Sequence, residues 1–186
     1  MKTVPLLCLC LLSALPLTAP AAPRAVLPQG SEIAFRVTQM GVDVSGRFTR
    51  FDARIDWVDD DPSRSSAEVT VDIGSLSTGD DEADAVALDK PWLNRAAFPQ
   101  AQFRSTSVRR LDATRYEASG TLTIRGRTRP LSFGFSLRPR DGGGALLEGE
   151  FAVLRSDFGI GGGEWNEGDL VADRVPVRVR LLLAPP

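Results

Sequence analysis

The chain has 186 residues, of which 42% are hydrophobic and 25% are charged, and its formal net charge is −2. These proportions are typical of one globular domain large enough for a hydrophobic core, and they exclude the broad basic field of a nucleic-acid-binding protein. The sequence contains no histidine, and its only cysteines, Cys8 and Cys10, lie near its start. Histidine-dependent catalytic triads and the usual zinc sites are therefore excluded, so no metal is expected.

The first residues are typical of a secretory signal peptide. Lys2 precedes an apolar stretch over residues 4–17, and small residues follow around Ala21, where signal peptidases cleave. The apolar stretch is too short to cross a membrane as a helix. We predict a signal peptide over residues 1–21, an exported domain over residues 22–186, and no disulfide in the exported domain, because both cysteines would be removed with the leader.

Alternating apolar and polar residues predict β-strands through most of the exported chain. After a proline-rich lead-in over residues 22–30, the expected strands cover residues 31–38, 42–57, 67–73, 102–111, 116–124, 131–138, 145–154 and 170–183. Phe48 is out of phase with its strand, which predicts a bulge near residues 49–50. Gly126 lies in the turn between the two most regular strands, where a positive φ is needed. Pro176 favours an edge or a bulge in the last strand.

One short helix is expected between the third and fourth strands, over residues 83–89. Ser77, Thr78 and Asp80 are the candidates for the N-cap, and the acids at 81 and 82 suit the first turn because acids favour helix N termini. A catalytic carboxylate pair among these acids and Asp84 is the alternative. We favour the capping role, and we predict that the protein is not an enzyme.

Eight antiparallel strands and one helix predict a single extended all-β barrel, because closure leaves no strand edge exposed. A barrel of about eight strands is either filled by side chains or holds one ligand, and the alternation alone leaves both readings open. The residues expected to face inward are Phe35, Val37, Phe51, Ile55, Trp57, Val71, Phe103, Leu122, Phe133, Phe135, Phe151 and Val153.

Several short motifs, in their order along the chain, resemble the YceI-like family. They are F-R-V from Phe35, G-R-F ending at Phe48, S-x-x-T-G-D ending at Asp80, F-P-x-A-x-F-x-S-T from Phe98, G-x-L-T-I-R-G-x-T-R-P from Gly120, R-S-D-F-G-I-G from Arg155 and G-E-W ending at Trp165. The resemblance implies a lipocalin-like barrel in an exported, periplasmic protein. It also implies binding of a long apolar chain, such as a polyisoprenoid, an isoprenoid quinone or a fatty-acid-derived lipid.

The resemblance and the alternation together supply candidate site residues, and no cofactor is expected besides a bound lipid or isoprenoid. The candidates for ligand contact are Phe35, Val37, Gln39, Phe51, Ile55, Val71, Leu88, Trp92, Phe103, Leu122, Phe133, Phe135, Phe151, Phe158 and Trp165. The candidates for contact with a polar headgroup are Gln39, Asp84, Arg155 and Asp157, although for Arg155 and Asp157 we favour a structural pair that closes the turn after the strand. Gln39 replaces a histidine that is present in many members of the family. The helix, with Trp92, is expected to cover one end of the barrel.

A structural or interaction module, accessory to a membrane electron-transfer or stress-response system, is the alternative function. It predicts a filled barrel and a large exposed apolar patch. A hydrophobic lipid is the expected partner, and nucleic acid is not. Transient contact with a membrane or a membrane protein, and formation of a homodimer, are further hypotheses.

Overall fold

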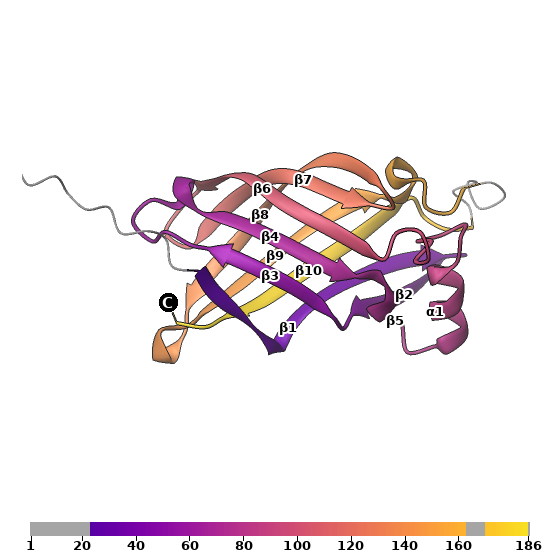
Figure 1. The fold of residues 1–186 in the computed structure, drawn as a ribbon, viewed down its shortest axis with the longest axis horizontal. Coiled ribbons are helices and arrows are strands. Elements are labelled where there is room, and N and C mark those ends of the chain that lie inside the picture. Colours follow the sequence, from indigo (N-terminus) through magenta and orange to yellow (C-terminus); the bar gives the residue numbers. More distant parts are fainter. Residues whose placement is uncertain (1–22, 163–169, 186) are drawn as a thin grey trace, which may run out of the picture.

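The computed structural model describes residues 23–162 and 170–185, so the predicted leader and Trp165 lie outside the described residues. The described chain folds into an elongated barrel with one α-helix near one end, while the strand ends close to both chain termini meet at the other (Figure 1). Within the described ranges no helix is long and apolar enough to cross a membrane.

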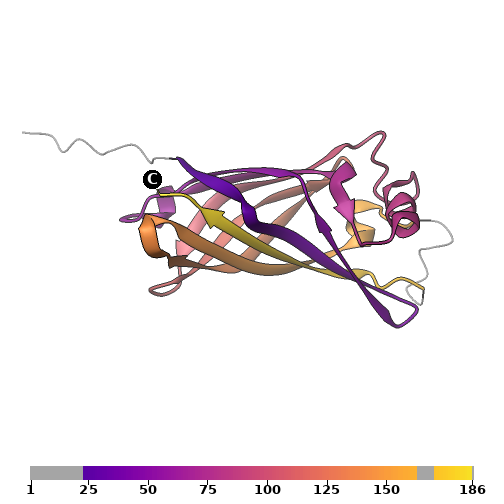
Figure 2. The same cartoon turned by 90° about the horizontal axis from the view of Figure 1, so that it is seen from below.

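The wall of the barrel is one antiparallel sheet. Its strands are β1 (Pro23–Gln39), β2 (Val42–Phe48), β3 (Phe51–Asp56), β4 (Ser66–Asp72), β5 (Leu76–Ser77), β6 (Gln100–Arg110), β7 (Arg115–Ile124), β8 (Arg127–Pro139), β9 (Ala145–Leu154) and β10 (Arg174–Leu183). They follow the order β10-β9-β8-β7-β6-β4-β3-β1-β2-β5, and β10 also pairs with β1, beside which it runs in Figure 2. Because β2 and β3 are two parts of one broken strand, as are β4 and β5, the described wall is the predicted closed eight-stranded barrel.

The break between β2 and β3 confirms the bulge predicted from the phase of Phe48. The ladder of β2 with β1 runs from Gln39 opposite Val42 to Ile33 opposite Phe48. The next two backbone N–H groups, of Thr49 and Arg50, instead donate to the carbonyl and hydroxyl oxygens of Ser75. The chain therefore turns a corner at residues 49–50 before β3 begins.

The prediction that residues 22–30 form an irregular lead-in is wrong, because β1 already begins at Pro23. Residues 23–25 pair with residues 54–56 of β3, and Val26 pairs with Leu183 of β10. Pro28 and Gly30 hide the alternation in this segment, but its backbone is needed to join β3 to β10. Closure of the barrel therefore makes a strand where the local pattern shows none.

Two predictions about turns and edges agree with the structure. Arg125 and Gly126 form a two-residue turn between β7 and β8 with φ of 49° and 70°, as expected for a type I′ hairpin. The ladder between β1 and β10 ends at Phe35 opposite Val177, so Pro176 lies at a local edge, where its missing N–H is tolerated.

Helix α1 (Asp81–Leu88) begins where the acidic cluster predicted it. The side chain of Asp80 accepts hydrogen bonds from the backbone N–H groups of Glu82 and Ala83 at 2.9 and 3.1 Å. The side chain of Asp84 accepts from the backbone N–H and the hydroxyl of Thr78, both at 2.7 Å. Asp80 and Asp84 thus stabilise the helix and the preceding loop, as the capping role requires.

The packed core fills the end of the barrel away from α1. Its centre is an aromatic plug of Trp57, Tyr116 and Phe135. The ring of Trp57 lies edge-on to Tyr116 at 4.9 Å and to Phe135 at 6.3 Å, and its Nε1 donates to Asp59 at 2.9 Å. Aliphatic side chains surround the plug, including the fully buried Leu181 and Leu183. These side chains therefore close this end of the barrel.

Asp72, at the end of β4, gives a prediction for the pH dependence of stability. Hydrogen bonds from the Arg50 guanidinium, at 2.8 and 3.0 Å, lower the pKa of this carboxyl, and the Gly74 N–H contributes in the same direction. A lowered folded-state pKa stabilises the fold fully above about pH 3.9, and this contribution is lost as the pH falls through the folded pKa.

We therefore expect Asp72→Asn to lower the free energy of unfolding at pH 7, by up to about 1 kcal/mol for an exposed pair. Urea denaturation of both proteins at pH 7 and at pH 2 measures the effect. The difference should shrink as the pH falls toward 2, because protonation of the wild-type carboxyl removes its charged hydrogen bonds with Arg50. An equal difference at both pH values would contradict the assignment to the carboxylate.

Candidate functional site

The barrel contains an internal cavity of about 170 Å³, lined almost wholly by apolar side chains, from Ile73 and Leu93 near α1 to Trp57 and Leu181 toward the chain termini. Seven of the predicted ligand-contact residues line it: Ile55, Val71, Phe103, Leu122, Phe133, Phe135 and Phe151. Trp57 and Val153, also predicted to face inward, complete this set. The alternation of the strands therefore located much of the lining.

Three phenylalanine rings form one wall of the cavity. Phe133 lies 5.6 Å from Phe103 and 5.1 Å from Phe151, measured between ring centroids. All three side chains are only half-buried although they point into the barrel, because they border empty space rather than other side chains. Covering such surface with a ligand stabilises a complex by about 25 cal/mol per Å².

Sequence reasoning missed other lining residues. They include Ile33, Phe48, Ile73, Leu93, Ile124, Val177 and Val179. Ile33, Val177 and Val179 lie in the apolar phase of strands that were predicted, so the alternation contained the signal. Leu93 lies in the turn after α1, where no periodic pattern marks it.

Other predicted contact residues do not line this cavity. They are Phe35, Val37, Gln39, Phe51, Leu88, Trp92 and Phe158. The ring of Phe35 lies over Gly46, which has no side chain to hold it back, and contacts Phe48 at 5.5 Å. Phe51 packs against the solid core. Trp165, the remaining candidate, lies outside the described residues.

Arg155 was a candidate headgroup contact, but its guanidinium is used within the protein. The residue is 3% exposed and lies in the short 3₁₀ segment Arg155–Phe158. It donates to the carbonyl oxygens of Ile160, Gly161 and Val171 at 2.9 Å and of Ala172 at 3.3 Å. Arg155 therefore joins the loop after β9 to the segment before β10.

Trp92 packs against Arg155 and does not line the cavity. The Arg155 guanidinium lies 5.9 Å from the centre of the Trp92 ring, within cation–π range. Gly161 has φ of 67°, and a Cβ there would lie 2.7 Å from Arg155 and 2.9 Å from Trp92, so glycine is required. The predicted cover at this barrel end is therefore formed by Trp92 and the loops, whereas α1 itself has no buried residue.

A second arginine ties the same loops together. Arg125, in the β7–β8 turn, donates from Nη2 to the Lys90 carbonyl at 2.8 Å and from Nη1 to the Gly159 carbonyl. Among the buried side-chain polar atoms of the described residues, only its Nε has no hydrogen-bond partner. The α1 end is therefore crossed by loops that Arg125 and Arg155 hold in place.

The other headgroup candidates are not brought together at the cavity. Gln39 is exposed where β1 ends, Asp84 is bound to Thr78, and Asp157 is exposed. Within residues 23–162 and 170–185, no group of three or more aspartate, glutamate, cysteine or histidine side chains is arranged to hold a metal ion.

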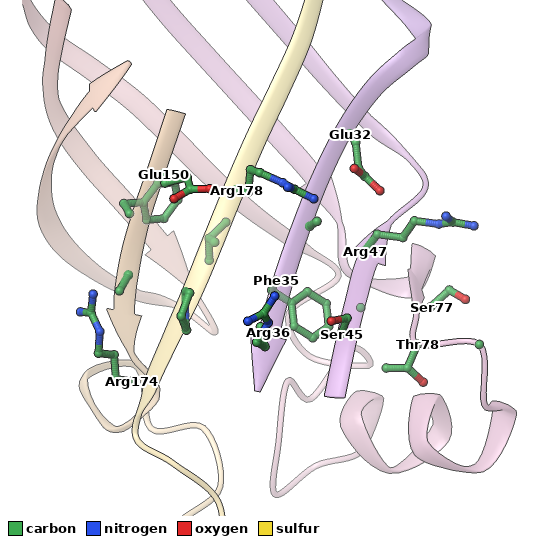
Figure 3. A pocket seen from close by; sticks show the side chains of 17 residues that line it. Glu32, Phe35, Arg36, Ser45, Arg47, Ser77, Thr78, Glu150, Arg174 and Arg178 are labelled. Carbon is green, nitrogen blue, oxygen red and sulfur yellow. The ribbon is translucent and has the colours of Figure 1, made fainter. Parts of the chain in front are cut away.

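A second hollow lies on the outside of the barrel, across β9, β10, β1 and β2 (Figure 3). This groove of about 610 Å³ has small side chains such as Ala34 on its floor, with Arg178 and Arg47 on either side in register. Its charged side chains are Glu32, Arg36, Arg47, Glu150, Arg174 and Arg178. Phe35, Phe151 and Val177 also line this groove, but the internal cavity is lined almost wholly by apolar side chains and is therefore the candidate site for an apolar chain.

Comparisons with known proteins agree with this architecture. The curated protein YceI of Salmonella arizonae is 31% identical over 138 residues, which cover 71% of this chain and 72% of that protein. The crystal structure of BcnA from Burkholderia cenocepacia superposes with a TM-score of 0.81 and 27% identity, covering 84% of this chain and 98% of that one.

A third protein shares the fold at lower identity. It is a domain from Saccharophagus degradans described as a polyisoprenoid binding domain, with a TM-score of 0.69 and 16% identity, covering 90% of this chain and all of that one. The sequence model of the YceI-like domain matches residues 25–183 here, nearly the whole of the barrel. This chain therefore belongs to the YceI-like domain family.

Proposed function

We propose that this protein binds one long apolar chain inside its barrel, as an exported periplasmic protein that transports, stores or sequesters the ligand. The observation that carries the proposal is the apolar cavity, whose phenylalanine rings lack partners on the side that faces the empty space. The polyisoprenoid-binding neighbour from Saccharophagus degradans supports an isoprenoid or acyl ligand here. The predicted signal peptide supports export.

The size of the cavity sets a requirement on the mode of binding. Its volume of about 170 Å³ is close to that of an engineered apolar cavity of about 150 Å³ that holds benzene. A polyisoprenoid, a quinone tail or a fatty acid is longer than that. Binding therefore requires the half-buried rings of Phe103, Phe133 and Phe151 to rotate, or part of the chain to lie outside the cavity.

Burial of an apolar tail makes the binding affinity depend more on the length of the tail than on its identity. Each buried CH₂ contributes about 0.8 kcal/mol, and an apolar wall discriminates weakly between tails of similar shape. We therefore propose the class of ligand, a polyisoprenoid, an isoprenoid quinone or a fatty-acid-derived lipid, and not one member of it. Consistent with a non-enzymatic role, Asp80 and Asp84, from the acidic cluster near α1, serve the helix and its loop.

One observation favours the alternative of an interaction module. Met40 and Val42, in and after the β1–β2 turn, are 73% and 65% exposed, and the Met40 N–H donates to the Leu170 carbonyl at 2.8 Å. Leu170 is itself exposed, so three apolar side chains come from two adjacent segments at this corner of the barrel. Contact with a membrane, a membrane protein or a second copy of the chain would cover them.

Native mass spectrometry of the protein purified after export tests the function directly. We expect a native mass above the chain mass, with an isoprenoid or acyl species released on denaturation. In Val71→Phe a ring should occupy the cavity and abolish or shorten the bound species, at a cost to stability of about 1–3 kcal/mol.

Val86→Phe is the matched control, because Val86 is exposed on α1 and does not line the cavity. It should carry the same ligand as the wild type. A wild-type mass equal to the chain mass, unchanged after incubation with isoprenoid quinones, polyprenyl phosphates and fatty acids, would overturn the proposal and favour the interaction module.

A further inference from the structure

We propose that the ligand passes through the side of the barrel, at a seam between β1 and the β2–β3 corner, and that this seam holds the part of the ligand that the cavity cannot. We define the seam by residues 26–32 on one side and residues 48–53 on the other. The proposal rests on the function proposed above, and it specifies a single-chain amphiphile with its tail inside and its head at the surface.

The seam is a stretch of wall without backbone pairing. On this side β1 pairs with β3 only through residues 23–25, and it pairs with β2 only from Ile33 onward. Between these ladders Pro28 has no N–H to donate, and Gly30 has φ of 90°. The pairing of β1 with β10 also shifts between Leu27 and Glu32. The segment thus bulges away from β3, as the diverging ribbons in Figure 1 show.

A groove of about 780 Å³ lies along this seam, and core residues form its floor. Ala53 belongs to the buried core cluster, and Val26 and Phe51 pack against that cluster. Phe48 lines both the groove and the internal cavity, and it is the last residue of the β1–β2 ladder. The apolar interior therefore meets the surface here, with the Phe48 ring between the groove and the cavity.

The two ends of the barrel are poorer routes. The aromatic plug and the buried leucines behind it fill the end near the termini. At the α1 end, Arg155 and Arg125 hold the described loops with side-chain hydrogen bonds to backbone carbonyl groups. Opening either end would break packing or these buried hydrogen bonds, whereas no backbone ladder has to break at the seam.

Another stretch of wall also lacks a ladder, but it is filled. The pairing between β8 and β9 stops at Phe135 opposite Gly149, so residues 127–134 of β8 have no partner on β9. There the rings of Phe133 and Phe151 pack across the gap at 5.1 Å. The Arg125 side chain also reaches from the adjacent turn to the Gly159 carbonyl. Of these two stretches without a ladder, the β1 seam is therefore the better passage.

The chemistry of the seam fits an amphiphile. Its floor is apolar, and charged side chains line its rim: Glu32, Arg47, Arg50, Asp52 and Arg180. A tail too long for the cavity would continue along the floor and bring its head to this wet rim. Part of the apolar surface that is buried on binding would then lie in the seam and not in the cavity.

Rates of exchange test the route. The fluorescent ligand is cis-parinaric acid, a polyene fatty acid whose emission rises when it leaves water, mixed with the exported protein in a stopped-flow instrument. In Phe48→Ala we expect association and dissociation to accelerate together by about tenfold, with a smaller change in Kd. In Phe48→Trp we expect both rates to fall.

Phe103→Ala is the matched control, because it removes the same ring from the cavity lining at a point of β6 that is paired with both β4 and β7. Its dissociation rate should rise while its association rate stays within about twofold of the wild type. Equal acceleration in Phe48→Ala and Phe103→Ala, or unchanged association in both Phe48 variants, would overturn the route. Absence of any fluorescence rise with the wild type would instead contradict the proposed function.

A label on the rim gives an independent readout, because the chain has no cysteine beyond Cys10. An environment-sensitive dye is attached at Asp52→Cys, which is exposed at the seam, or at Thr121→Cys, which is exposed on β7. Saturation with the fatty acid should change the emission at position 52 and leave position 121 unchanged. Equal responses, or none at position 52 when the ligand is bound, would count against occupancy of the seam.

Discussion

Replacing Trp57 with alanine is expected to lower the free energy of unfolding by about 3–5 kcal/mol, the usual cost of removing a large buried aromatic side chain. Trp57 is 6% exposed and contacts both Tyr116 and Phe135. Its removal takes away the edge-on partner of both rings, which keep their mutual stacking at 5.4 Å, and it removes the hydrogen bond to Asp59. In a thermal melt this corresponds to a fall in Tm of about 10 °C.

Two variants separate packing from hydrogen bonding in this effect. Trp57→Phe keeps a ring in the plug but loses the Nε1 donor, and it should cost about 1–2 kcal/mol. Leu111→Ala, at an exposed position, should change stability by no more than about 0.5 kcal/mol. A loss below about 1 kcal/mol in Trp57→Ala would show that the plug is not a main source of stability.

Trp57→Ala should also affect ligand binding, because Trp57 lines the internal cavity. Its loss should lengthen the hollow part of the barrel toward the chain termini. We expect Trp57→Ala to accept longer apolar chains than the wild type, and native mass spectrometry with acyl chains of increasing length measures this. Stability and ligand length should therefore change in opposite directions in one variant.

Replacing Arg155 with methionine is expected to cost about 3 kcal/mol or more, since it leaves several buried carbonyl groups without their donor. Methionine has a similar length but donates no hydrogen bonds, so the carbonyls of Ile160, Gly161 and Val171 lose a partner at 2.9 Å. Lysine should restore little of the loss, because its compact ammonium cannot reproduce the planar set of donors.

Hydrogen exchange should localise this effect. The amides of Gly161 and Ala172 donate to Pro91 and Thr38, across the loops that Arg155 holds, and we expect both to lose protection in Arg155→Met. The amide of Leu137, at the other end of the barrel, should exchange as in the wild type. Arg109→Met is the control, because the Arg109–Glu117 pair is exposed and should contribute no more than about 1 kcal/mol. Uniform loss of protection would mean that Arg155 acts on global stability alone.

Local pattern in the sequence determined most of the fold. Period-two alternation predicted the eight strands of the barrel, because one face of each strand must be buried. The phase error at Phe48 predicted the corner between β2 and β3, Gly126 predicted a turn with positive φ, and Asp80 predicted the start of α1. Each of these features depends on residues close together in the chain, so a short stretch of sequence is enough to predict it.

Tertiary structure alone decided which part of the interior is filled. Leu137 and Phe151 have the same apolar, alternating context, yet Leu137 is 8% exposed in the packed core while Phe151 is half-buried beside empty space. That difference depends on the volumes of side chains that meet across the barrel from distant strands. Sequence alternation reports the direction of a side chain, not the space opposite it.

Arg155 and β1 also depend on contacts that the local sequence does not reveal. The sequence favoured a structural role for Arg155 over a headgroup contact, but the carbonyl groups that it binds, from residues 160–161 and 171–172, are brought together only by the folded loops. Residues 23–30 form strand because β3 and β10 need a partner there, although Pro28 interrupts the pattern. Short-range pattern therefore determined the strands, the turns and the helix cap, whereas long-range packing decided the cavity, the closed loops and the open seam.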